Sequence, residues 1–109
     1  MTWNVIFLPE ADKDLESLSH PQRVLVRKAI EKVRENPLPQ SEGGYGKPLG
    51  NKCGLNLTNL LKIKLKDSGI RIVYKLIRTE TNMLIVVVGA RADEEAYRLA
   101  HKRRIRRGI

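Results

Sequence analysis

Cationic side chains gather in residues 60–78, on either side of a turn at Asp67-Ser68-Gly69. In both flanking runs apolar and cationic residues alternate, and side chains on a strand point alternately to opposite faces, so the segment predicts a β-hairpin. The cationic positions in these runs are Lys62, Lys64, Lys66, Arg71 and Lys75. Cations that share one face of a sheet can hold a phosphate group, and a planar guanidinium can do so with two hydrogen bonds.

The alternation also predicts the register of this hairpin. With Asp67-Ser68 at the tip, Lys64 lies opposite Arg71, and Ile63 lies opposite Ile72. A slip of one residue would bury the lysines, so the pattern specifies the pairing. Like charges directly opposite each other destabilise a sheet by roughly 0.2–1 kcal/mol per pair, and a bound anion would relieve this repulsion. A solvated lysine face without a function is the alternative interpretation.

The net charge of the chain indicates the class of partner that it favours. Lysine and arginine outnumber the acids by 21 to 12, which gives +9 at pH 7. A surplus of this size on a small domain favours a polyanion, with nucleic acid first and an acidic protein as the alternative. Aromatic residues make up 5% of the chain, which disfavours the broad base-stacking platforms of single-strand binders. No helix joins a lysine face to a long apolar face, so no membrane partner is expected.

Length and cysteine content are typical of a small intracellular domain. The 109 residues are expected to form one domain, spanning residues 1–109. The single cysteine, Cys53, excludes an internal disulfide, suits a reducing compartment and is interpreted as a structural or incidental thiol. No apolar run approaches the roughly 18–20 residues of a membrane span and no signal peptide is recognisable, so a cytoplasmic location is predicted. No histidine, cysteine or carboxylate cluster has ligand spacing, so no metal and no cofactor are expected.

The N-terminal third of the chain predicts a strand followed by two helices. Residues 3–8 are apolar and β-prone. Pro9 suits the first turn of a helix that ends near Ser19. Ser19 and Gln22 have the spacing of a capping box for a second helix, which stops at Asn36-Pro37.

The rest of the chain predicts an irregular segment, an inner strand and a last helix. Residues 36–59 contain three prolines and five glycines and are expected to form a long loop, of the kind that is usually functional or mobile. Residues 83–88 are apolar throughout, as in a strand buried on both faces. Asp93 is placed to cap a basic helix from Glu94 to about Ile105. The order strand, helix, helix, strand, strand, strand, helix indicates an α+β fold, an antiparallel twisted sheet of about four strands with a helical hairpin packed on one face and a C-terminal helix.

Several motifs, in this order and length, resemble those of a known family. They are Lys62-Ile63-Lys64-Leu65, Ser68-Gly69-Ile70-Arg71-Ile72-Val73-Tyr74, and Val88-Gly89-Ala90-Arg91 followed by Ala96-Tyr97. Over essentially its whole length the chain resembles the RelE/ParE toxin superfamily of bacterial type II toxin–antitoxin modules. The segment 40–59 departs from the family pattern, because it is expanded before the lysine-rich strand.

The resemblance implies one of two activities. RelE-like members cut messenger RNA in the ribosomal A site, whereas ParE-like members inhibit DNA gyrase and lack the cleavage residues. This sequence keeps the RelE-like set, which implies a metal-independent endoribonuclease, an mRNA interferase, with the catalytic residues Lys62, Lys64, Arg71, Arg91 and Tyr97. The alternatives are a ParE-like gyrase inhibitor without catalysis and a nucleic-acid-binding module with neither activity.

The resemblance also implies the partners of the protein. They are a cognate antitoxin, which neutralises the toxin in a hetero-oligomer, and the 70S ribosome with its message. DNA would be reached only indirectly, through the antitoxin complex. The cations expected to bind RNA or the ribosome are Lys66, Lys75, Arg98, Lys102 and Arg103.

Cleavage of RNA through its own 2′-hydroxyl needs a base for that hydroxyl, cations for the phosphate and an acid for the leaving 5′ oxygen. The chain has two histidines, His20 and His101, in different predicted surroundings, which disfavours an ordinary two-histidine ribonuclease. Tyrosine ordinarily has a pKa near 10, and neighbouring cations favour its charged form. We therefore hypothesise that Tyr97, or a lysine with a lowered pKa, is the base, and that Arg91 assists the leaving group.

The aromatic residues have packing roles as alternatives to chemistry. Tyr97 lies on an amphipathic helix, where a tyrosine more often packs in the core than takes part in chemistry. The resemblance favours a functional role for it instead. Tyr74 and Trp3 are expected in the core. Tyr45, in the glycine-rich part of residues 36–59, is a candidate for stacking on a base, with an ordinary loop position as the alternative.

Overall fold

The computed structural model describes residues 2–52 and 54–109, so that Cys53, interpreted above as an incidental or structural thiol, lies outside the described residues. No helix in the described part of the chain is both long and apolar enough to cross a membrane. The helices and strands are β1 (Asn4–Phe7), α1 (Pro9–Glu16), α2 (His20–Val33), β2 (Lys47–Lys52), β3 (Leu55–Lys64), β4 (Arg71–Ile77), β5 (Asn82–Ala90) and α3 (Asp93–Arg107). Short 3-10 turns cover Gln40–Glu42 and Arg78–Glu80.

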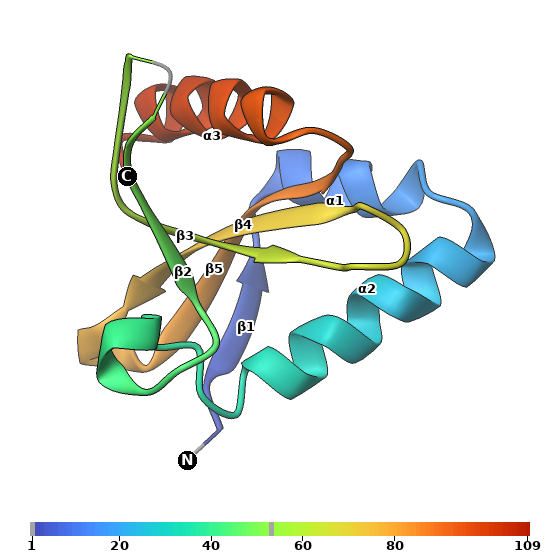
Figure 1. Cartoon of the computed structure of the whole chain (residues 1–109), viewed down its shortest axis with the longest axis horizontal. Helices are drawn as coiled ribbons and strands as arrows, with labels where there is room; N and C mark the ends of the chain where they lie inside the picture. Colours follow the sequence, from blue (N-terminus) through green and yellow to red (C-terminus); the bar gives the residue numbers. More distant parts are fainter. Residues whose placement is uncertain (1, 53) are drawn as a thin grey trace.

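The described strands form one five-stranded sheet in the order β1-β5-β4-β3-β2 (Figure 1). The predicted α+β class and the order of the helices are confirmed, and the predicted inner strand at 83–88 is β5, buried between β1 and β4. Two details of the sheet differ from the prediction. β1 runs parallel to β5, so the sheet is mixed, and β2 is an additional strand. Alternation predicts the face that a side chain takes but not the direction of the neighbouring strand.

The additional strand lies in the segment that was predicted to be an irregular loop. β2 contains Pro48 and Gly50, which weaken a strand pattern, but proline is tolerated at the edge of a sheet. β3 begins at Leu55, before the predicted hairpin. Asn59 has a positive φ of 73°, and the pairing of β2 with β3 shifts between Pro48 and Gly50. This irregularity interrupts the alternation, so the first half of β3 does not have the pattern of the second.

The hairpin of β3 and β4 has the predicted register. Lys64 pairs with Arg71, and Ile63 pairs with Ile72. The backbone of Leu65 closes the turn, because its N–H donates to the carbonyl of Ile70 at 2.8 Å and its carbonyl accepts from the N–H of residue 69 at 2.8 Å. The hairpin therefore brings one cation from each strand to the same level of the sheet.

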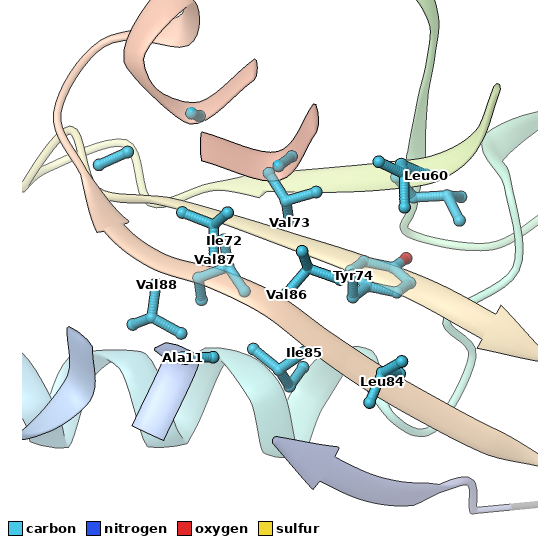
Figure 2. Packing of buried hydrophobic residues seen from close by; sticks show 14 of the residues in the cluster. Ala11, Leu60, Ile72, Val73, Tyr74, Leu84, Ile85, Val86, Val87 and Val88 are labelled. Atoms are coloured by element: carbon cyan, nitrogen blue, oxygen red, sulfur yellow. The ribbon is translucent and has the colours of Figure 1, made fainter. Parts of the chain in front are cut away.

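The helices cover both faces of the sheet, with α1 and α2 on one face and α3 on the other (Figure 1). Ile63, near the end of β3, and Leu65, just beyond it, line a cavity with Ala29 and Val33 of α2. Buried residues of β4 and β5 fill the space between α1 and α3 (Figure 2). Since Lys62 alternates with Ile63, its side chain lies on the α3 face. The predicted cationic face is therefore partly covered by a helix.

Local signals for the second helix and for the core are confirmed. Ser19 Oγ accepts from the N–H of Gln22 at 3.4 Å, and the Gln22 amide oxygen accepts from the N–H of Ser19 at 3.2 Å, which completes the capping box of α2. Tyr74 is fully buried, and its hydroxyl donates to the carbonyl of Pro37 at 2.7 Å. Burial raises the pKa of Tyr74 above its ordinary value. Trp3 is half-buried and packs against the core.

An ion pair covers the part of β5 that β1 leaves unpaired. The pairing of β1 with β5 ends at Ile85. Beyond it, the Asp14 carboxylate of α1 accepts from the N–H of Val88 at 3.1 Å, and Arg103 of α3 donates to the carbonyl of Val86 at 2.9 Å. Arg103 and Asp14 also form an ion pair, and only 12% of the Arg103 side chain is exposed. The pair joins α1, β5 and α3.

Candidate functional site

Lys62 is the buried cation of the site. Its residue exposure is 7%, and it lies beneath the N-terminal half of α3. Its ammonium donates to Asp93 Oδ1 at 2.9 Å and to the hydroxyl oxygen of Tyr97 at 2.8 Å. Burial opposes the charged form of Lys62, but the hydrogen bonds to Tyr97 and Asp93 outweigh burial and raise its pKa above the ordinary value. The raised pKa of Lys62 does not favour the hypothesis that this lysine is a base with a lowered pKa.

Arg71 is held in one orientation by three acceptors. Its Nε donates to Asp93 Oδ1 at 2.9 Å, and its Nη1 donates to the backbone carbonyls of Gly69 and Arg91. No described residue accepts a hydrogen bond from Nη2. Since an arginine carries five N–H donors in a rigid fork, the two donors on Nη2 remain for a ligand.

Asp93 joins these two cations, and sequence reasoning assigned it a different role. It was predicted to cap the last helix, but α3 begins at Asp93 itself, and the N-cap residue is Ala92, without a side-chain cap. The hydrogen bonds from Lys62 and then Arg71 lower the pKa of Asp93 to about 2, so its carboxylate is charged at neutral pH. A buried lysine needs a counter-ion, and this need could have pointed to Asp93. The sequence does not show that a helix covers Lys62, so the role of Asp93 was not predicted.

Tyr97 is one turn further along α3 and lies against the sheet. Its exposure is 6%, and its hydroxyl oxygen accepts the hydrogen bond from Lys62. The fully buried Ala96 and Ala100 flank it, and their small side chains allow α3 to approach the sheet closely. Tyr97 thus packs in the core and contacts the buried cation at the same time.

The exposed cations of the predicted catalytic set lie at the tip end of the hairpin. Lys64 is exposed and pairs with Arg71 across strands that are about 5 Å apart. Arg91 is also exposed, and its Nη1 donates to the carbonyl of Ser68 in the turn at 3.1 Å. Because Arg71 donates to the carbonyl of Arg91, the two arginines are neighbours. The structure therefore brings the five predicted residues to one end of the sheet. Lys62 and Tyr97 are buried and Arg71 is mostly buried, whereas Lys64 and Arg91 are exposed.

The residues predicted to bind RNA or the ribosome do not form one surface. Lys66 is exposed beside the hairpin tip, whereas Lys75 lines a cavity of about 410 Å³ near the other end of β4. Lys102 is exposed on α3. Arg98, also exposed on α3, forms an ion pair with Glu94, and the mostly buried Arg103 is engaged by Asp14.

The ion pairs of Asp93 make a prediction for acid stability. Its pKa of about 2 in the folded protein lies below the value near 4 of an unfolded aspartate, so these pairs stabilise the fold above about pH 4 and lose that effect as pH falls towards 2. Urea unfolding of wild type and Asp93→Asn at several pH values should therefore give a stability difference that shrinks between pH 5 and pH 2.5. Asp67→Asn, which removes an exposed carboxylate at the tip, is the control, and a difference independent of pH would contradict the prediction.

Comparisons with known proteins agree with this fold. No family model matches the sequence. The chain is 29% identical over 103 residues to the mRNA interferase toxin RelE of Escherichia coli K12. The aligned residues cover 94% of this chain and 98% of that protein. The mRNA interferase RelE of Shigella flexneri matches with the same identity and coverage. Among solved structures, a mutant of E. coli toxin RelE in the free state, with two arginines replaced by alanine, has a TM-score of 0.71 at 27% identity. The match covers 94% of this chain and 98% of the other.

The order β-α-α-β-β-β-β-α with a mixed five-stranded sheet is therefore an α+β fold of the RelE-like class. The match extends over nearly the full length of both chains, in sequence and in structure. Over nearly its full length the chain is similar to the RelE toxins of type II toxin–antitoxin systems. The resemblance seen in the sequence is confirmed at this level.

Proposed function

We propose that the protein is a ribosome-dependent mRNA endoribonuclease, which cuts message in the A site through the RNA 2′-hydroxyl and so inhibits translation. The observation that carries the proposal is the orientation of Arg71, whose Nη1 and Nε are fully engaged while Nη2 has no acceptor among the described residues. The relatives at 29% identity that are called mRNA interferases support the same activity. Action on the ribosome implies a cytoplasmic location.

The phosphate at the cleaved bond is the ligand that we assign to the three cations near the hairpin tip, Lys64, Arg71 and Arg91. Arg71 directs two N–H donors from Nη2 to one phosphate oxygen, and Lys64 contributes a second positive charge from the paired strand. Arg91, anchored to the turn by Ser68, stabilises the charge that develops on the leaving 5′ oxygen. In this arrangement Lys64, Arg71 and Arg91 together bind the reacting phosphate and its leaving oxygen.

Tyr97 is the base in this mechanism, and Lys62 supports it. The Lys62 ammonium donates to the phenol oxygen and so stabilises negative charge there. The phenolate takes the proton of the 2′-hydroxyl, the 2′ oxygen attacks phosphorus, and the bond from phosphorus to the 5′ oxygen breaks. The leaving oxygen takes a proton from water, which gives a 2′,3′-cyclic phosphate and a 5′-hydroxyl end. Alignment of the message by the ribosome contributes several kcal/mol of the barrier reduction.

A cognate antitoxin is the second partner in this proposal. One chain of the intact E. coli RelBE toxin–antitoxin complex is 26% identical to this chain, with a TM-score of 0.60 over 80% of this chain and 94% of that one. The net charge of +9 suits an acidic partner segment. A neighbouring gene for a short protein with an acidic segment is the expected companion.

Induced expression in bacteria, with mapping of message ends, tests the function. We expect translation arrest, with message cut within the A-site codon, and relief of both effects by the companion protein. Intact message together with an SOS response would instead identify a gyrase inhibitor. Intact message with neither translation arrest nor an SOS response would indicate a binding module without catalysis. Each of these two results would overturn the proposal.

A further inference from the structure

A carboxylate lies inside the cation cluster. Asp93 Oδ1 accepts from both Lys62 and Arg71 at 2.9 Å, and 45% of the Asp93 side chain is exposed. No described residue donates to its second oxygen, Oδ2. A negative charge here repels the phosphate that the neighbouring cations would attract, so binding of RNA alone does not explain its presence.

The cations need this carboxylate for their geometry. A buried ammonium without a counter-ion carries a large desolvation penalty, and Asp93 is the anion that contacts Lys62. With Asp93 in place, Lys62 is held against the hydroxyl of Tyr97. Asp93 also fixes the Nε end of Arg71, whereas the backbone carbonyls fix only Nη1. The direction of Nη2 therefore depends on both contacts.

We propose that Asp93 is a positioning residue that lowers the affinity for RNA and raises the rate of cleavage. It acts through Lys62 on Tyr97 and through Arg71 on the phosphate. This inference rests on the cleavage function proposed above. A residue that merely joined α3 to the sheet would lower affinity and rate together when it was removed, or change neither.

Asp93→Asn tests the inference, because it keeps an oxygen acceptor of the same shape and removes the charge. Binding is measured on ribosomes programmed with a message that carries a 2′-deoxy nucleotide at the cleaved position. We expect binding about fivefold tighter, because one repulsive charge near the phosphate is lost. The single-turnover rate at saturation should fall about 10- to 100-fold, because Arg71 and Lys62 lose their alignment.

Two further variants separate charge from position. Glu94→Gln removes the neighbouring exposed carboxylate, which pairs with Arg98, and should leave the rate within twofold of wild type. Asp93→Glu keeps the charge but moves the oxygens by one methylene, so it should bind RNA like wild type and cleave about tenfold more slowly. If Asp93→Asn does not fold, Asp93→Glu decides, and a rate equal to wild type would overturn the inference.

A structural measurement keeps the inference separate from the function. The Nε proton of Arg71, detected by NMR through its attached ¹⁵N, should exchange slowly with solvent in wild type. The exchange should be faster in Asp93→Asn. If wild type does not cleave, the proposed function is wrong, while exchange and binding still report on Asp93. If wild type cleaves and Asp93→Asn binds more weakly or keeps its rate, the role of Asp93 is wrong and the function stands.

Discussion

Arg71→Ala should lower the single-turnover rate of cleavage of ribosome-bound message by about a thousandfold. The guanidinium is the group that offers two oriented donors to the phosphate, and it is held by three protein acceptors before RNA arrives. Its loss removes both the charge and the orientation. The rate is measured with excess toxin and programmed ribosomes, so that binding and product release do not limit it.

Two variants act as controls for this effect. Arg71→Lys keeps the charge but not the planar guanidinium. Its rate should be less than tenfold higher than that of Arg71→Ala, because the lysine ammonium is a point charge. Arg78→Ala removes an exposed arginine beyond the far end of β4 that pairs with Glu42, and should change the rate less than threefold. A rate for Arg71→Ala within tenfold of wild type would remove this residue from the mechanism.

Tyr97→Phe should lower the same rate by about a hundredfold, because it removes the oxygen that accepts the proton in the proposed mechanism. The ring remains, so packing of α3 is kept, but Lys62 loses one of its two acceptors. The free energy of unfolding should therefore fall by about 1 kcal/mol. Single-turnover kinetics and urea unfolding, carried out on the same preparation, measure the two effects.

Tyr74→Phe is the matched control for this variant. It also removes a tyrosine hydroxyl, one that donates to Pro37 and lies on the other face of the sheet. A comparable loss of stability of about 1 kcal/mol, without a loss of rate, is expected. If both variants lost rate equally, the effect of Tyr97→Phe would be one of stability, and a wild-type rate in Tyr97→Phe would exclude this residue as the base.

Local signals in the sequence were sufficient for much of the scaffold. The strict alternation around the turn predicted the pairing of Lys64 with Arg71, because the other register would have buried lysines. The capping box at Ser19 depends on two side chains three residues apart, and it forms as predicted. The apolar run at 83–88 predicted a strand with neighbours on both sides.

Features that depend on contacts between distant segments were not predicted. β2 was missed because an edge strand tolerates proline, and because the irregularity near Asn59 interrupts the alternation of β3. The parallel pairing of β1 follows from the path of the whole chain. Neither feature has a local pattern.

The candidate site shows the same division. Alternation placed Lys62 on the cationic face but gave no indication that α3 covers that face. The role of Asp93 follows only from this cover, because the buried ammonium then needs an anion. Arg103 was predicted to meet RNA by its charge alone, whereas its partner Asp14 is 89 residues away in the chain.

The ion pair of Asp14 and Arg103 also bears on self-association. Beyond Ile85, the outer edge of β5 would present unpaired backbone groups in an apolar setting, which is the kind of edge on which a second chain can add a strand. The pair occupies two of these groups with side chains from opposite ends of the chain. Folding of the C-terminal helix and protection against aggregation are therefore coupled, and a chain interrupted before residue 103 would expose a template for intermolecular strand pairing.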